Sequence, residues 1–181
     1  MVNLGFNLFL LLFVAFATAF DVFQRRIPNW LVLAGALGGL LFSLAEGPPS
    51  GFESFLGLLV GIGILVVPFA LGWLGAGDVK LLGAVGALLG VRMLPRVFFY
   101  TALCGMLMAL VSIAFRGTKW QAFSESWREF KLALLTRGQM MPSSVGEKVS
   151  AGNRAVPYGV AIATGAVVAF FIDSEGKWAG F

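Results

Sequence analysis

The chain has 181 residues, of which 59% are hydrophobic and only 12% are charged, and its formal net charge is +4. Ordinary soluble domains carry about 25% charged residues, so this composition predicts an integral membrane protein. The absence of histidine and the single cysteine, Cys104, exclude histidine-based catalysis, histidine-ligated zinc and an internal disulfide.

Six apolar stretches have about the length needed to cross a bilayer as helices, which takes roughly 20 residues. The fold that we expect is therefore all-α, a polytopic membrane protein with about six transmembrane helices. The fourth stretch is the shortest and also fits a re-entrant or tilted segment. In chain order the predicted spans are about 4–20, 29–45, 54–73, 80–95, 97–115 and 155–172.

The first stretch also resembles a signal peptide, because Ala17, Thr18 and Ala19 look like a small-residue cleavage site. A signal peptide carries its positive charge before the apolar run. Here the first basic residues, Arg25 and Arg26, follow it. We therefore interpret this stretch as a retained membrane helix.

The basic residues orient the helices, because Lys and Arg concentrate in cytoplasmic loops. Arg25 and Arg26 assign the end of the first helix to the cytoplasm. With six spans, the loops on that side are 21–28, 74–79 with Lys80 at its border, and 116–154, and together they hold ten Lys and Arg. The opposite side holds three. Both termini are thus predicted to lie outside the cytoplasm.

The predicted cytoplasmic loop 116–154 contains an amphipathic pattern. Large apolar side chains from Trp120 to Leu134 recur with 3-4-3-4 spacing, and Lys, Arg and Glu fall between them. This pattern predicts a helix lying in the cytoplasmic interface of the membrane. We favour an anchor for the long loop, and a platform for a substrate or partner is the alternative.

Two aspartates are expected at the same membrane face. Asp21 directly follows the first span and Asp78 lies between the third and fourth, so both arrive at the cytoplasmic end. An ionisable group at membrane depth costs about 2.5–3.5 kcal/mol and usually marks function. Two neighbouring carboxylates share a proton, so that one acts as a base toward water while the other acts as an acid. This chemistry needs neither metal nor histidine.

Other roles for these aspartates stay open at this point. Asp21 could pair with Arg25 or Lys80, and Asp78 could cap the fourth helix. The alternative function is a proton-coupled transporter or channel that uses the aspartates as a proton relay. A third reading is a catalytically inert subunit of a pilus or secretion machine.

The flanking residues fit close approach of a peptide to the aspartates. Gly75 and Gly77 permit backbone conformations that other residues avoid, and Pro28 suits the start of the second helix. Lys80 either tunes the charge of the pair or extends to lipid headgroups. Six further glycines are expected to be helix-packing contacts. They are Gly35, Gly38, Gly39, Gly57, Gly61 and Gly63.

These motifs, in this order, resemble those of the type IV prepilin peptidases, the bacterial members of the Gly-x-Gly-Asp intramembrane aspartic proteases. The resemblance implies that Asp21 and Asp78 are catalytic and that the remaining motif residues support them. The matching residues are Asp21, Ile27, Pro28, Asn29, Gly75, Gly77, Asp78, Lys80, Pro157, Tyr158 and Gly159.

The resemblance also implies a single membrane-embedded peptidase domain over 1–181 in the bacterial inner membrane, with no cofactor or metal. Its expected partners are a prepilin or pseudopilin, whose basic leader is cut at the cytoplasmic face, and membrane lipids, but no nucleic acid. Larger members carry paired Cys-x-x-Cys motifs and N-methylate the new terminus with S-adenosylmethionine. This chain resembles the short, peptidase-only type of Flp or tight-adherence pilus systems, so we do not expect methylation.

Overall fold

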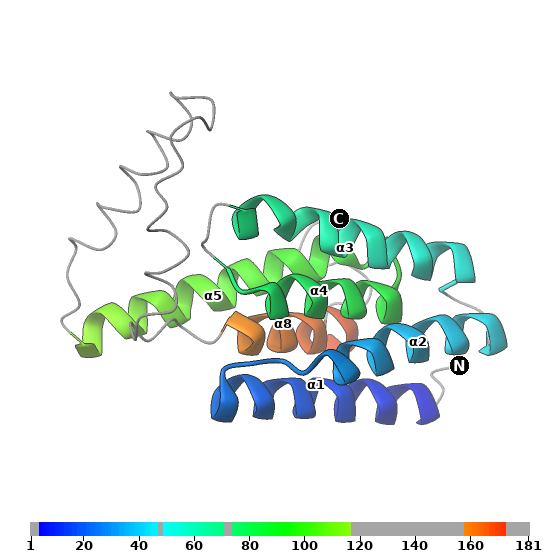
Figure 1. The fold of residues 1–181 in the computed structure, drawn as a ribbon, viewed down its shortest axis with the longest axis horizontal. Helices are drawn as coiled ribbons and strands as arrows, with labels where there is room; N and C mark the ends of the chain where they lie inside the picture. Colours follow the sequence, from blue (N-terminus) through cyan, green and yellow to red (C-terminus); the bar gives the residue numbers. More distant parts are fainter. Residues whose placement is uncertain (1–3, 47–48, 71–73, 117–157, 173–181) are drawn as a thin grey trace.

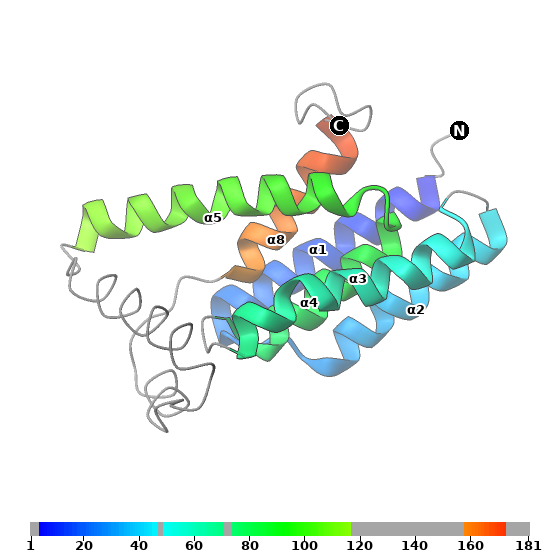
Figure 2. The ribbon, with the colours of Figure 1, turned by 90° about the horizontal axis from the view of Figure 1, so that it is seen from above.

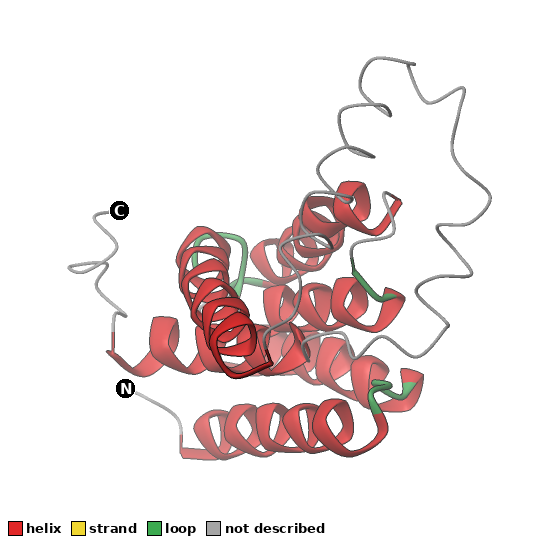
Figure 3. Cartoon of the chain, turned by 90° about the vertical axis from the view of Figure 1, so that its left-hand side faces the viewer, coloured by secondary structure: helices red, strands yellow, loops and turns green. Residues whose placement is uncertain are grey.

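The computed structural model describes residues 4–46, 49–70, 74–116 and 158–172, and these residues are helical apart from short turns (Figure 1). Figure 3 shows helix and loop, without a strand, in this part of the chain. The predicted all-α fold is therefore confirmed here. The helices are α1 (Leu4–Gln24), α2 (Asn29–Glu46), α3 (Gly51–Ala70), α4 (Ala76–Leu89), α5 (Leu94–Arg116) and α8 (Tyr158–Val167), which continues as the π-helical segment η1 (Val168–Ile172).

Two of these helices, α1 and α3, are long and apolar enough to cross a membrane by themselves. Shorter apolar segments occur in α2, α5 and α8 with η1. The 14 residues of α4 extend only about 21 Å at 1.5 Å per residue, less than the roughly 30 Å of a hydrocarbon core. Six complete spans therefore stay a prediction.

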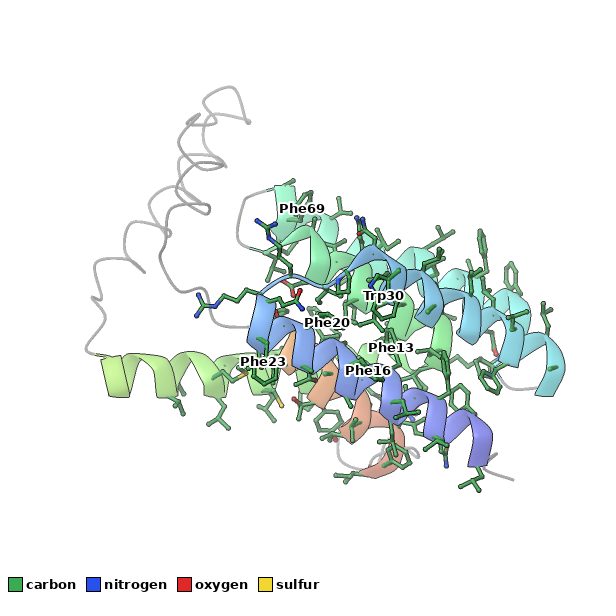
Figure 4. All side chains as sticks on the ribbon, turned by 60° about the horizontal axis from the view of Figure 1, so that its bottom comes forward. Phe13, Phe16, Phe20, Phe23, Trp30 and Phe69 are labelled. Carbon is green, nitrogen blue, oxygen red and sulfur yellow. The ribbon has the colours of Figure 1, made fainter. Side chains whose placement is uncertain are left out.

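The surface of the helices is apolar. Large hydrophobic side chains point outward from α1, α2, α3 and α5, as Figure 4 shows. On α1, for example, Phe16 is 53% exposed and Phe23 is 85% exposed. Soluble proteins rarely expose contiguous apolar patches beyond a few hundred Å², whereas lipid tails favour such a surface. The exposed side chains thus agree with the membrane class that the composition predicts.

The core of the bundle is α4, which packs against α2, α3 and α8. Its residues from Leu81 to Leu89 are all buried. A helix that is apolar on every side is stable only when other elements surround it. The short length of α4 and its small residues, among them Gly83 and Gly86, let its neighbours enclose it.

Glycines set the distances between these helices. Gly57 of α3 faces Gly86 of α4, and a Cβ atom on either would overlap the carbonyl oxygen of the other. Gly39 of α2 approaches the backbone of Ala87 in the same way, and a Cβ atom on Gly61 would lie 2.6 Å from the carbonyl oxygen of Leu82. Small residues at such crossings let two backbones approach closely in membrane bundles.

The remaining glycines show where the packing prediction holds and where it fails. Gly35 and Gly38 make room for the rings of Phe13 and Phe9. Gly63, in contrast, has nothing within 4 Å of the position that its Cβ atom would take. The prediction is therefore confirmed for Gly35, Gly38, Gly39, Gly57 and Gly61 and wrong for Gly63, which lies on an open face of α3.

The fourth and fifth helices are shifted from the predicted ranges 80–95 and 97–115. α4 ends at Leu89 because Gly90 adopts a left-handed φ of 80° and its N–H donates to the Gly86 carbonyl oxygen at 2.9 Å. α5 already begins at Leu94, since Pro95 occupies its first turn, where a missing N–H costs nothing. Arg92, expected inside the fourth span, lies in the turn between these helices.

Two other helix boundaries have local causes. α3 begins three residues earlier than the predicted 54–73, because Ser50 and Glu53 form a capping box. The Ser50 N–H donates to Glu53 Oε2 at 3.1 Å and the Glu53 N–H donates to Ser50 Oγ at 3.3 Å. Helix α1 continues past the predicted 4–20 to Gln24, so Asp21 lies within its last turn. Of the loop 116–154, including its amphipathic helix, all but Arg116 lies outside the described residues.

The substitution Gly86→Ala is expected to lower the free energy of unfolding by about 1–3 kcal/mol, because its methyl group would overlap the Gly57 backbone. Thermal unfolding in detergent measures this loss. The matched control is Gly63→Ala, a helical glycine with open space around it, which should unfold at or slightly above the wild-type temperature. Equal unfolding temperatures for the two variants would contradict the packing described here.

Candidate active site

The carboxyl end of α1 and the amino ends of α4 and α8 lie at one end of the bundle, on the left in Figure 1, and Figure 2 shows the same arrangement from above. Helix α2 begins nearer the middle of the bundle, because the segment after α1 first runs back alongside α1, and its first residue, Asn29, accepts a hydrogen bond from Lys80 of α4. Since α1 and α3 run toward this end, the chain turns there twice. The topology thereby brings motif residues that are far apart in the sequence into one region.

Asp21 lies in the last turn of α1 and is buried, with 7% of its surface exposed. Its Oδ2 atom accepts a hydrogen bond from the backbone N–H of Val160 at 3.1 Å. Gly159 is equally close, because a Cβ atom on it would lie 2.6 Å from the same oxygen. The carboxylate of α1 is thus held by the amino end of α8.

The turn after Asp21 is formed by the residues that precede α2. Arg25 adopts a left-handed φ of 51°, and its N–H donates to the Asp21 carbonyl oxygen at 3.1 Å, which ends α1. The Pro28 carbonyl oxygen accepts the first hydrogen bond of α2, from the Leu31 N–H at 3.1 Å. Between them, Ile27 packs against Gly77, whose Cβ atom would lie 3.4 Å from that of Ile27. The turn therefore contacts the amino end of α4 directly.

Asp78 is the third residue of α4, and its carboxylate caps that helix. Oδ2 accepts a hydrogen bond from the Gly75 N–H at 3.2 Å, and the Asp78 N–H donates to the Gly75 carbonyl oxygen at 3.1 Å. The capping role considered from the sequence is therefore present. A carboxylate has two oxygens and about four acceptor positions, so a cap on one oxygen leaves capacity for chemistry on the other.

The two aspartates influence each other electrostatically. Asp78 lies outside α1 and α3, the two helices able to span a membrane. Its burial and then the negative charge of Asp21 raise the pKa of Asp78 from 3.8 to about 6. A like charge disfavours ionisation of a neighbouring carboxylate when the two groups are close. The pair therefore takes up its first proton at a pH closer to neutrality than an isolated aspartate does.

Lys80 follows Asp78 by two residues in α4 and bonds to another motif residue. Its Nζ donates to Asn29 Oδ1 at 3.0 Å, linking α4 to the first residue of α2. The two residues are 51 positions apart in the sequence. This hydrogen bond ties together the helix that carries Asp78 and the turn that follows Asp21.

Tyr158 and Gly159 begin α8 at this same end of the bundle. The Tyr158 ring packs against Gly105 of α5, whose Cβ atom would lie 3.1 Å from Cε2, and Tyr158 is within electrostatic range of Asp78. Pro157 lies outside the described residues. The structure brings the other predicted site residues together. They are Asp21, Ile27, Pro28, Asn29, Gly75, Gly77, Asp78, Lys80, Tyr158 and Gly159.

Two contributors to the site were not predicted from the sequence, namely Val160, which supplies a backbone donor, and Gly105, which makes room for Tyr158. A backbone N–H leaves no side-chain signal, although the first-turn N–H groups of any helix are free to bind an anion. Within the described residues, no group of three or more Cys, Asp or Glu is arranged to hold a metal ion.

Comparison with known proteins points to one family. A model of the type IV leader peptidase family matches residues 8–110, which include both aspartates. The chain is 35% identical over 109 residues to a prepilin leader peptidase/N-methyltransferase of Aeromonas hydrophila, covering 55% of this chain and 37% of that protein. No solved structure matches.

Two further proteins with the same name are similar. The protein of Pectobacterium carotovorum subsp. carotovorum is 32% identical over 111 residues, covering 58% of this chain and 40% of that protein. The protein of Bacillus subtilis (strain 168) is 30% identical over 95 residues, covering 51% of this chain and 38% of that protein. The chain thus spans about two fifths of the length of these relatives.

The raised pKa of Asp78 predicts how one substitution changes stability with pH. Because the folded state disfavours the ionised form, wild-type stability declines as the pH rises through about 6. Asp78→Asn removes this charge while its amide oxygen still accepts the Gly75 N–H. At pH 8 the variant should therefore be more stable than wild type by about 1–2 kcal/mol, and at pH 4 the two should be equal. Thermal unfolding of wild type and variant at pH 4 and pH 8 measures this difference in stability. A difference that is the same at both pH values would contradict the prediction.

Proposed function

The chain belongs to the type IV leader peptidase family, as its motifs predicted, and on that premise we propose that it is an intramembrane aspartic endopeptidase whose catalytic residues are Asp21 and Asp78. The observation that carries this proposal is their proximity. The carboxylates come from different helices, and the charge of Asp21 acts on Asp78. Both lie inside the family-matched region 8–110.

In the proposed reaction the two carboxylates activate one water molecule. The ionised carboxylate takes a proton from the water, and the water oxygen bonds to the carbonyl carbon of the scissile peptide. The protonated carboxylate donates its proton to the carbonyl oxygen. The C–N bond then breaks as a proton moves to the leaving nitrogen. A pair that holds one proton has both an acid and a base ready.

The proposed substrate is a prepilin or prepilin-like protein with a basic leader peptide. The relatives reported above are named for this activity. A substrate of this kind carries an apolar helix after its leader. The exposed apolar faces of α1 and α5 are surfaces against which such a helix could pack within the membrane. The scissile bond would then lie at the end of the bundle where Asp21 and Asp78 meet.

We further propose that this end of the bundle faces the cytoplasm of a bacterium, with the protein in its inner membrane as one domain over 1–181. Arg25 and Arg26 closely follow Asp21 in the sequence, Lys80 closely follows Asp78, and positive residues favour the cytoplasmic side. The proposal covers peptidase activity only, because the paired Cys-x-x-Cys motifs of the larger members have no counterpart in a chain with one cysteine. Metal and cofactor play no part in it.

Cleavage of a prepilin substrate by point variants tests the catalytic assignment. Asp21→Asn and Asp78→Asn should each lower the cleavage rate by at least about 10³-fold, because each removes one partner of the acid–base pair while preserving side-chain shape. Cleavage is read from the gel shift of a co-expressed prepilin, with membrane levels of each variant measured by immunoblot. Glu53→Gln is the control, since Gln can replace Glu in a capping box and the residue lies at the opposite end.

Full cleavage by either aspartate variant would overturn the dyad assignment. The transporter alternative has a different signature, because proton flux would then occur in proteoliposomes without any peptide substrate. Flux that disappears in Asp21→Asn, together with unchanged prepilin length, would favour that alternative over the peptidase.

Cysteine labelling tests the orientation. In a Cys104→Ala background, a single cysteine introduced at Ser143 should react only with a thiol reagent that reaches the cytoplasm, because 116–154 is the loop richest in basic residues. A cysteine at Ser50, between α2 and α3, should react with a membrane-impermeant reagent added outside. The reverse labelling pattern would invert the proposed topology and move the site to the other face.

A further inference from the structure

Asp21 depends on a helix other than its own for its hydrogen bond. Its carboxylate is buried in the last turn of α1, and Oδ2 accepts the Val160 N–H from the first turn of α8 at 3.1 Å. The first-turn N–H groups of a helix have no partner inside that helix and carry partial positive charge. The amino end of α8 therefore holds one oxygen of the carboxylate in a defined position.

Gly159 makes this approach sterically accessible. A Cβ atom there would lie 2.6 Å from Asp21 Oδ2 and 2.8 Å from its Cγ, so any side chain would displace the carboxylate. Asp78 differs in this respect, because a Cβ atom on Gly75 would lie at an ordinary 3.4 Å from its Oδ2. The two carboxylates are thus held differently, Asp78 by the start of its own helix and Asp21 by a third helix.

The amino end of α8 is itself supported on two sides. Its helix packs against α1 and α5, and most of its residues are buried. Gly165 of α8 meets the backbone of Thr101 of α5, and the Tyr158 ring packs against Gly105. A donor on a helix held in this way has a fixed position, which is what orientation of a reacting group requires.

We propose that the amino end of α8 positions Asp21 for the reaction, with the Val160 N–H orienting its carboxylate and Gly159 as the positioning residue that leaves room for it. The proposal rests on the proposed function, and it adds to the catalytic unit an element outside the family-matched residues 8–110. Neither residue contacts the substrate in this view. Both act through Asp21.

The first test removes the donor. Val160→Pro deletes the N–H at a first-turn position, where a helix tolerates proline, and should lower kcat for a prepilin substrate by at least about 10²-fold with KM within threefold, as misplacement of a catalytic group does. Val160→Ala keeps the N–H and should remain at least tenfold faster than Val160→Pro. Phe52→Pro, in the first turn of α3 at the opposite end, controls for the effect of proline itself.

The second test fills the space beside the carboxylate. Gly159→Ala should lower kcat by a similar factor while the protein stays folded at the assay temperature, since alanine favours helix. Gly63→Ala is its matched control, because nothing lies within 4 Å there. Wild-type kcat in either Gly159→Ala or Val160→Pro would overturn the proposal, as would a loss of activity that only follows a loss of folded protein.

Amide hydrogen exchange tests the contact without using activity. The Val160 amide of the wild-type protein in detergent should exchange more slowly than in Asp21→Ala, where the acceptor is gone. Equal exchange rates would overturn the positioning role even if the α8 variants failed to fold. If instead Asp21→Asn cleaves the substrate like wild type, the proposed peptidase mechanism fails, while the exchange result still decides whether α8 holds Asp21.

Discussion

The enclosure of α4 determines the rest of this structure. The helix is apolar around its whole circumference and too short to cross a bilayer, so it is stable only when α2, α3 and α8 surround it. That enclosure requires backbones to approach closely, and the facing glycines of α3 and α4, Gly57 and Gly86, permit it. Because α4 is enclosed by the helices around it, its first turn lies near the carboxyl end of α1, where the charge of Asp21 acts on Asp78.

This arrangement destabilises the ionised form of Asp78. Asp78 is kept from ionising at its usual pKa by burial and by the charge of Asp21, which is unfavourable for folding above that pKa. The bundle offsets the cost with local hydrogen bonds, from Gly75 to Asp78 and from Val160 to Asp21. Groups with perturbed pKa values concentrate at active sites, which supports the role proposed for this pair.

Most of the site could be predicted from the sequence, because its residues are recognised by their side chains and because the number of helices between them determines at which end of the bundle each lies. Asp21 and Asp78 were assigned to one end by counting spans, with Lys80 at the border of the same loop. The hydrogen bond between Lys80 and Asn29, in contrast, was not predicted. Helix ends were less predictable. Gly90 ends α4 because of its left-handed backbone angle, which a hydropathy pattern does not reveal. Gly63 was predicted to be a packing glycine because it is a glycine in a helix, but no neighbouring helix lies close to it. The Val160 donor could not be predicted from side chains because it belongs to the backbone.

The different supports of the two carboxylates have a consequence for how the site is assembled. Asp78 and its cap lie within four residues, so this half forms as soon as the first turn of α4 forms. Asp21 and Val160 are separated by 139 positions, so the other half is completed only when α8 packs against α1 and α5. Contacts between residues far apart in the sequence cost more chain entropy to form. The position of Asp78 therefore depends on its own helix, whereas the position of Asp21 depends on the packing of the whole bundle. The proposed site is therefore complete only in the fully assembled helix bundle.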